Sequence, residues 1–209
     1  MRVTAETKTA TRQRILDAAQ KLFAGQGFEA ATTRDIARAA EIAAGTLFNY
    51  FPTKESIALC LVSEAHAQAV EQFQAASSRE SSEPLSLEEE LFAHVAAALR
   101  KLKPFRKYLT TVLDTSLSPL SSDQGDGTPA LRAGHLEIVS QIALRHGQEE
   151  ALSTVALHLY WTLYTGVLAF WSKDNSPRQE DTLALLDQSL AMFVGWLATH
   201  VNPAVPKDK

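Results

Sequence analysis

Residues 33–50, TRDIARAAEIAAGTLFNY, constrain the fold of this chain more than any other stretch. Ile36 and Ala40 would lie on one face of a short helix. Leu47 and Phe51, four residues apart, would lie on one face of a second short helix. Helices this short are not stable alone, so they need a third element to pack on. The pattern therefore predicts two short helices joined by a tight turn and set against a longer helix.

The second short helix carries uncharged polar side chains beside a glycine. Thr46, Asn49 and Tyr50 would point away from its apolar face, next to Gly45. Such side chains donate or accept hydrogen bonds at base edges and phosphates, and a glycine lets the helix approach closely. The expected chemistry is contact with nucleic acid.

A longer helix precedes this pair, from about Thr11 to Ala24. Its apolar residues recur at helical spacing: Ile15, Ala18, Ala19, Leu22 and Phe23. Residues 1–10 show no such periodicity, so a flexible arm is expected there. The basic residues of that arm either contact phosphates or belong to a solvated terminus.

Residues 14–57 resemble the DNA-binding domain of the TetR family of bacterial transcriptional regulators. The most specific part is the string GTLFNYFPTKE, which joins a small residue, an aromatic pair and a Pro-Thr-Lys helix start. The resemblance implies a helix-turn-helix domain, a homodimer on a near-palindromic double-stranded operator, and a small-molecule effector. Together with the polar pattern it gives the expected DNA contacts: Thr33, Arg34, Ala44, Gly45, Thr46, Asn49, Tyr50 and Lys54.

Two departures from the family pattern bear on DNA binding. The turn between the short helices usually carries Gly, where this chain has Glu41. The second helix usually begins with Ser and a polar or basic residue, where this chain has Ala43 and Ala44. The second departure removes a side-chain cap, worth roughly 1 kcal/mol, and two candidate contacts with DNA.

Capping signals mark the helix starts around this motif. Thr32 and Asp35 have the spacing of a capping box. Thr33 would then lie in a first helical turn, where free backbone N–H groups favour a phosphate. Thr53 would cap a long fourth helix that runs to about Ala75. A phosphate is expected at the start of that helix too.

The charge is unevenly divided along the 209 residues, whose formal sum is −4. Residues 1–60 hold eight Lys/Arg and six Asp/Glu, giving +2, which leaves −6 for the remainder. This asymmetry has the direction expected of an N-terminal DNA-binding part, but it is small. Cys60 is the one cysteine, so no intramolecular disulfide forms, and no secretory signal is visible. A cytoplasmic protein is expected.

The remainder of the chain predicts helices only. Polar loops are expected at 77–86 and 118–129. Helices are expected at about Leu87–Leu102, Phe105–Leu117, Ala130–Arg145, 151–172 and Arg178–His200. The prediction is an all-α fold of about nine helices. It would comprise a helix-turn-helix DNA-binding domain at 1–53 and a ligand-binding and dimerisation domain at 54–209.

Residues 151–172 contain no Asp, Glu, Lys or Arg and are long enough to span a membrane. One His and five Ser/Thr dilute the stretch, so a helix buried on all sides is expected instead. Its apolar seam and that of the last helix would pair about a twofold axis as a four-helix bundle. The expected dimer interface is Leu159, Leu163, Gly166, Phe170, Leu183, Leu186, Leu190, Phe193 and Leu197.

Large aromatic residues on internal faces of the second domain predict a mostly apolar effector cavity. Core packing explains each of these residues singly, and the cavity explains them together. The candidate ligand contacts are Phe92, Phe105, Tyr108, His135, Trp161 and Tyr164. The expected effector is a partly apolar small molecule.

Motifs of enzymes do not occur. The six His residues lack HExxH spacing, and there is no GxSxG, P-loop or GxGxxG pattern. We therefore expect no catalytic residue, no cofactor and no metal. The leading hypothesis is a dimeric regulator, in particular a repressor, released from its operator by a small molecule. The alternative is an all-α dimeric ligand- or partner-binding protein with a degenerate head, which Glu41, Ala43 and Ala44 keep open.

Overall fold

The computed structural model describes residues 4–77, 84–112 and 128–200. Within these ranges the chain forms nine α-helices, three short 3-10 helices and no strand, which confirms the all-α prediction. The α-helices are α1 Ala5–Gly25, α2 Thr33–Ala39, α3 Ala44–Phe48, α4 Lys54–Ser77, α5 Leu87–Leu102, α6 Arg106–Val112, α7 Thr128–Arg145, α8 Thr154–Lys173 and α9 Glu180–His200. The expected loops at 77–86 and 118–129 lie largely outside the described residues.

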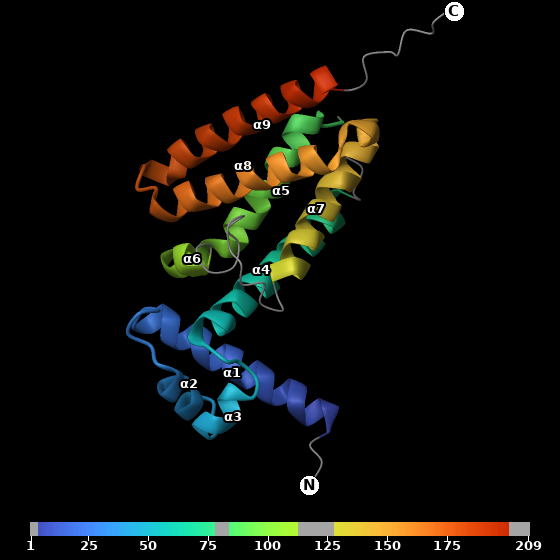
Figure 1. The fold of residues 1–209 in the computed structure, drawn as a ribbon. Coiled ribbons are helices and arrows are strands. Elements are labelled where there is room, and N and C mark those ends of the chain that lie inside the picture. The colour runs from blue at the N-terminus through green and yellow to red at the C-terminus, as the bar shows by residue number, and fades with distance from the viewer. Residues whose placement is uncertain (1–3, 78–83, 113–127, 201–209) are drawn as a thin grey trace, which may run out of the picture.

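Helices α1, α2 and α3 form a compact head at the lower end of the molecule (Figure 1). Ile15 and Leu16 of α1, Ile36 of α2 and Leu47 of α3 are fully buried against one another's helices. Phe51, which follows α3, is also buried. The long helix therefore provides the packing surface that the two short ones need.

Helix α1 begins earlier than predicted, and the flexible arm expected at residues 1–10 is wrong for residues 5–10. The hydroxyl of Thr4 accepts a hydrogen bond from the backbone N–H of Thr7 (3.3 Å) and caps the helix. The first turns are exposed, so their sequence shows no apolar period, although Ala, Glu and Lys favour helix. Residues 1–3 lie outside the described part.

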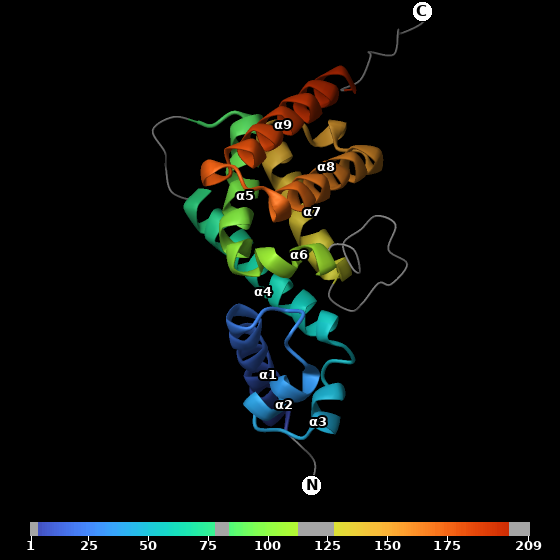
Figure 2. The same ribbon diagram turned by 90° about the vertical axis from the view of Figure 1, so that its left-hand side faces the viewer.

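Helix α4 runs out of the head into the larger upper domain (Figures 1 and 2). There it packs against α5, α6 and α7. Helices α8 and α9 lie side by side at the far end of the domain, in contact along their length. The order of packing places α4 between the head and the core of the upper domain.

Helix α6 lies at the junction of the two parts (Figure 2). The chain enters it through a 3-10 turn, Lys103–Phe105, and the α-helix ends its described length at Val112, so the last residues of the helix predicted at 105–117 lie outside the described part. The ring of Tyr108 stacks on Phe28 of the head with centroids 5.2 Å apart, and meets the edge of Phe23 at 5.2 Å. Tyr108 thus makes two ring contacts between the upper domain and the head.

A capped turn joins α8 to α9. The Asp174 carboxylate accepts hydrogen bonds from the backbone N–H (3.1 Å) and hydroxyl (2.5 Å) of Thr182, and from the N–H of Ser176 (2.7 Å). These bonds hold the pKa of Asp174 well below its usual range. On the other side Arg106 of α6 donates to the carbonyl oxygens of Trp171 (2.8 Å) and Asp174. The end of α8 is therefore tied both to α9 and to α6.

By length and composition one described helix, Pro177–Thr199, could cross a membrane, and 33% of its window is buried. A core helix of a globular protein passes the same test. Leu186, Leu190, Phe193 and Leu197 of this helix are buried against their own domain. The apolar stretch 151–172, whose length suggested a span, falls mainly in α8, where Tyr160, Trp161, Tyr164 and Trp171 are buried but several side chains are exposed.

Candidate nucleic-acid interface and ligand clefts

Helix α3 is short and packs against the rest of the head through one face. Leu47 is fully buried, whereas Ala44, Gly45 and Asn49 are exposed. Thr46 and Tyr50 are half-buried, so each keeps part of its surface accessible. The predicted polar residues are thus gathered on one outer face, with no formal charge among them.

The start of α3 and the turn before it show the physical effect of the two departures. Ala43 stands at the N-cap and provides no side-chain hydrogen bond. Glu41 has a backbone φ of 55°, in the left-handed region that favours glycine. Adopting that region costs a residue with a Cβ roughly 1 kcal/mol. The turn therefore has the backbone that Gly would suit, although this chain has Glu there.

The capping box at the start of α2 forms as predicted. The Asp35 N–H donates to the Thr32 hydroxyl (3.2 Å), and the Thr32 N–H donates to the Asp35 carboxylate (3.3 Å). Thr33 is the first residue of the helix and is half-buried. Arg34 is exposed, and Arg38 pairs with Asp35 at 3.3 Å. This helix start therefore carries a partly accessible hydroxyl, Thr33, followed by an exposed cation, Arg34.

Lys54, an expected phosphate contact, has partners within the head. Its ammonium donates to the carbonyl oxygen of Phe28 (2.8 Å) and lies 4.2 Å from the centroid of the Phe28 ring. In this structure Lys54 therefore fastens the loop after α1 to the start of α4. The Thr53 hydroxyl accepts from the Ser56 N–H (3.0 Å), so the predicted cap of α4 is present.

Phe48 is a surface residue that the sequence did not single out. Half of its surface (50%) is exposed, more than for the other large apolar side chains described in the head. An aromatic residue at this spacing reads as part of the core, so hydropathy alone hides it. Its place on α3, within the string GTLFNYFPTKE, is the signal that could have identified it.

Three of the six predicted ligand residues gather in the upper domain around a buried histidine. The rings of His135 and Tyr164 stack with centroids 4.0 Å apart, and Trp161 lies 5.9 Å from His135. His135 also bonds to His66 (Nδ1–Nε2, 2.9 Å) and to the Tyr160 hydroxyl (Nε2–Oη, 3.2 Å). His66 and Tyr160 were not predicted: His66 lies on α4, far from His135 in sequence, and Tyr160 lies on α8 beside the predicted Trp161.

A third buried histidine, His94, completes this group. Its ring lies 4.7 Å from that of His135 and meets the edge of Phe73 at 5.0 Å. Among the described residues, neither of its ring nitrogens has a hydrogen-bond partner, and the Tyr164 hydroxyl has none there either. Burial lowers the pKa of His66 to about 4 and that of His94 to about 3, so both rings are neutral at pH 7. In the described part no group of His, Cys, Asp and Glu could hold a metal ion.

The other three predicted ligand residues lie elsewhere. Tyr108 packs on the head as described above, and Phe105 lies 6.0 Å from it. Phe92 is half-buried at the edge of the core. The structure therefore does not bring the six aromatic and histidine residues into one cavity, and none of them is among the residues that line the two larger clefts.

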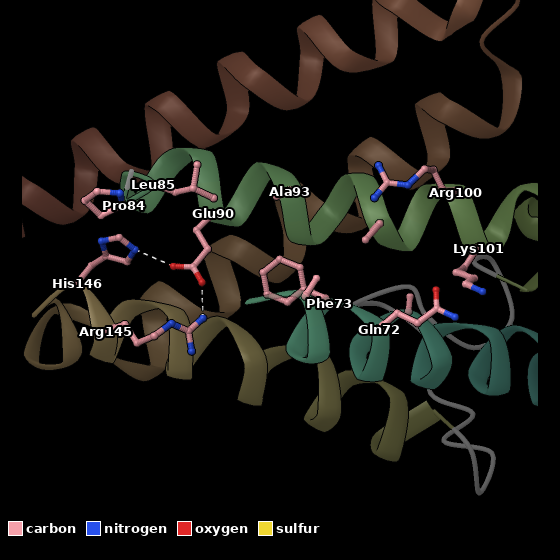
Figure 3. Close-up of a pocket in the computed structure, with 13 residues that line it drawn as sticks. Gln72, Phe73, Pro84, Leu85, Glu90, Ala93, Arg100, Lys101, Arg145 and His146 are labelled. Atoms are coloured by element: carbon pink, nitrogen blue, oxygen red, sulfur yellow. Dashed lines mark hydrogen bonds and ion pairs between the residues drawn. The ribbon is translucent and has the colours of Figure 1, made fainter. Parts of the chain in front are cut away.

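The first cleft is a groove of about 760 Å³ between α4 and α5, which we call the α4–α5 groove (Figure 3). Its lining residues are Ala69, Gln72, Phe73, Ala76, Pro84, Leu85, Glu90, Ala93, Ala97, Arg100, Lys101, Arg145 and His146. At one end the Glu90 carboxylate pairs with Arg145 (2.5 Å) and His146 (2.8 Å). Arg100 and Lys101 lie at the other end (Figure 3).

The second cleft, of about 730 Å³, lies between the head and the upper domain. It is lined by Arg12 and Tyr50 of the head and by Ser63 and His66 of α4, among others. Arg12 pairs with Glu64 (2.9 Å) and also donates to Cys60. Burial, with Glu64 nearby, raises the pKa of the Cys60 thiol to about 11, so this cysteine stays protonated and unreactive.

The predicted dimer residues fall into two groups. Leu186, Leu190, Phe193 and Leu197 are buried within the chain and hold α9 to its own domain. The others keep accessible surface: Leu159 and Leu163 are half-buried, and Gly166, Phe170 and Leu183 are exposed. Among the large apolar side chains of these two helices, Val155 (67%) and Met192 (72%) are the most exposed, and the sequence prediction did not include them.

The head matches a known family over the stretch that carries this geometry. Residues 15–60 match the family model described as "Bacterial regulatory proteins, tetR family". Over these residues the chain is similar to the DNA-binding domain of the TetR family. The "HTH-type transcriptional repressor KstR2" of Rhodococcus jostii is 48% identical over 50 residues, which are 24% of this chain and 24% of that protein. The "HTH-type transcriptional repressor AcnR" of Corynebacterium glutamicum is 39% identical over 63 residues, 30% of this chain and 34% of that protein.

These matches to curated relatives span only about a quarter to a third of their length. Solved TetR-family structures extend the likeness to the whole fold. FadR of Thermus thermophilus, solved in complex with lauroyl-CoA, matches with a TM-score of 0.64 at 21% identity, over 95% of this chain and 98% of that one. FadR of Bacillus subtilis, in complex with stearoyl-CoA, matches with a TM-score of 0.59 at 20% identity, over 87% and 97%. At this identity the likeness concerns the fold.

Proposed function

We propose that this chain is a homodimeric DNA-binding repressor of the TetR family, which a small molecule releases from its operator. The observation that carries the proposal is the outer face of α3 within a head that matches the family. This outer face of α3 is uncharged and accessible. Gly45 leaves room for close approach, because a Cβ at this position would meet no atom of another part of the chain within 4 Å. In the cytoplasm such a head would read a near-palindromic operator.

The division of labour on DNA follows from the chemistry of each side chain. Thr46 would offer its hydroxyl or methyl group to a base edge, and Asn49 its amide. Tyr50, Thr33 and Arg34 would hold phosphates. Phe48 would add apolar contact with a thymine methyl or a sugar. Lys54 would reach a phosphate only after leaving its Phe28 partner, so we assign it a positioning role in the head.

Residues 54–209 would form the ligand-binding and dimerisation domain. The proposed dimer face is formed by the exposed side chains of Val155, Phe170, Leu183 and Met192 on α8 and α9, together with the half-buried Leu159. Two such pairs of helices related by a twofold axis form a four-helix bundle. The dimer would set the two heads about 34 Å apart, one turn of the double helix.

Effector release would follow from differential binding. A ligand that binds a dimer with mismatched head spacing more tightly than the DNA-bound dimer lowers operator affinity. The acyl-CoA complexes of the two FadR structures make acyl-CoA a candidate to test first. The Tyr108 contact between α6 and the head is the place where such a change would be passed on.

Selection from a random DNA library, followed by mobility shifts, tests the proposal. A palindromic consensus is expected. Tyr50→Phe should weaken binding to all sequences alike, because it removes a phosphate contact, whereas Thr46→Val should change base preference. Glu71→Gln, an exposed change on α4, serves as the control. Enrichment of no sequence would contradict the proposal and favour a protein with a degenerate head.

A further inference from the structure

The α4–α5 groove has the shape of a site for an elongated molecule. Its middle is lined from both helices by small or apolar side chains: Ala69, Phe73, Ala76, Ala93 and Ala97. On α5 the groove extends from Glu90 to Lys101, about 16 Å along the helix axis. Figure 3 shows the charged side chains at its two ends, with the uncharged Gln72 between them. A compact ion would leave the apolar middle of such a groove unused.

The charges of the groove are unequal at its two ends. Glu90, the one carboxylate among the lining residues, is bound by Arg145 and His146. Arg100 and Lys101 line the other end, and in the described part of the chain neither has a hydrogen-bonding or ion-pair partner. The groove is therefore lined by three cationic side chains and one carboxylate. Two of the cations, Arg100 and Lys101, are available to a ligand.

We propose that the α4–α5 groove binds a single-chain amphipathic anion. The anionic group lies between Arg100 and Lys101, and the apolar chain lies over the alanines of α4 and α5 towards Phe73. Guanidinium and ammonium groups form charge-assisted hydrogen bonds with carboxylate or phosphate oxygens. Burial of the chain against apolar walls supplies the rest of the affinity. An amphipathic cation of the same length is repelled at this end.

This inference names the effector class of the regulator proposed above, and its regulatory meaning rests on that proposed function. The binding itself does not involve DNA. A direct binding measurement therefore fails or succeeds independently of operator binding.

The probe is 11-(dansylamino)undecanoic acid, whose fluorescence rises in an apolar site, and the comparison ligand is its uncharged methyl ester. Both are titrated into the full chain at low concentration. The acid should bind wild type about tenfold or more tightly than the ester, because charge-assisted hydrogen bonds contribute on that scale. The double variant Arg100→Glu/Lys101→Glu should lose about tenfold or more of the affinity for the acid and none for the ester.

A matched control has the same change of net charge outside the groove. Lys103→Glu/Lys107→Glu alters two exposed lysines that follow on the chain and do not line the groove. It should bind both ligands as wild type does. A further variant, Ala97→Trp, fills the middle and should weaken the acid and the ester alike. Equal binding of acid and ester by wild type, or full affinity for the acid in Arg100→Glu/Lys101→Glu, would overturn the proposal.

Discussion

The head and the upper domain differ in how they satisfy their polar groups. In the head, Thr11 donates to the carbonyl oxygen of Thr7 (2.8 Å), and Thr32 and Asp35 cap α2. In the upper domain, counted from α4 onwards, five buried side-chain atoms of the described residues have no partner: Ser63 Oγ, both ring nitrogens of His94, Gln148 Oε1 and Tyr164 Oη.

This difference separates two ways of building a domain. Local hydrogen bonds specify the shape of the head, which must match a rigid surface. Each orphan group in the upper domain costs about 1–3 kcal/mol relative to a satisfied one. Replacing a single unpartnered group should therefore stabilise the upper domain, whereas a single substitution should stabilise the head only slightly. The predictions below test this contrast.

The largest effect is expected from charge placed in the core of the upper domain. Leu190→Glu puts a carboxylate where Leu190 is 3% exposed, and an unpaired buried charge costs about 5 kcal/mol. The change should unfold or strongly destabilise the upper domain in urea denaturation. Met192→Glu, two residues away and 72% exposed, should leave the fold intact and instead weaken the proposed dimer. Light scattering separates the two outcomes. If Met192→Glu is folded and still dimeric, the dimer interface does not include Met192.

Acid should destabilise the upper domain more than the head. The pKa values of His66 and His94 are lowered to about 4 and about 3 by burial, from the ordinary 6.5 of the unfolded chain. Between the lowered pKa values and 6.5 the unfolded chain binds more protons than the folded one. The neutral histidines therefore contribute their full stability above pH 6.5, and this contribution is lost as the pH falls towards the lowered pKa values. At pH 5 each of these two histidines should lower the free energy of unfolding by about 2 kcal/mol relative to pH 7. Urea titrations at both pH values measure this.

Removing the orphan ring should stabilise the chain. His94→Leu replaces a buried group with two unpartnered nitrogens by an apolar one of similar size, and a gain of about 1–3 kcal/mol is expected at pH 7. The same variant should lose its share of the acid sensitivity. His146→Leu is the contrasting change, because it removes a partner of Glu90 and should destabilise. A loss of stability in His94→Leu would show that the ring has a partner in solution.

The smallest effect is expected in the head. Ala43→Ser supplies the missing N-cap of α3 and should stabilise by about 1 kcal/mol or less. Ala44→Ser, one residue inside the helix, is the matched control and should not stabilise. The measurement is the urea midpoint of the transition that includes the head. An equal gain in both variants would mean that capping is not the cause.

Features that depend on neighbouring residues could be predicted from the sequence, and features that depend on contacts between distant residues could not. The capping pairs Thr32–Asp35 and Thr53–Ser56 and the bounds of α5 depend on a few neighbouring residues, so they could be predicted or recognised. The start of α1 was missed because an exposed helix has no apolar period. The meeting of His66 with His135, 69 residues apart, and the groove made by alanines of α4 and α5 depend on tertiary packing alone. Likewise, the apolar seam of α9 identified a packing face but not whether its partner was the same chain or another.

Helix α6 gives the molecule a direct mechanical connection. It is seven residues long, and two of its side chains face different parts of the protein. Arg106 holds the carbonyl oxygens that end α8, while Tyr108, two residues later, packs against the aromatic rings of Phe23 and Phe28 in the head. Only two residues, about half a turn of helix, thus separate the two attachments. A displacement of the end of α8 must either move the head with it or break one of these two contacts.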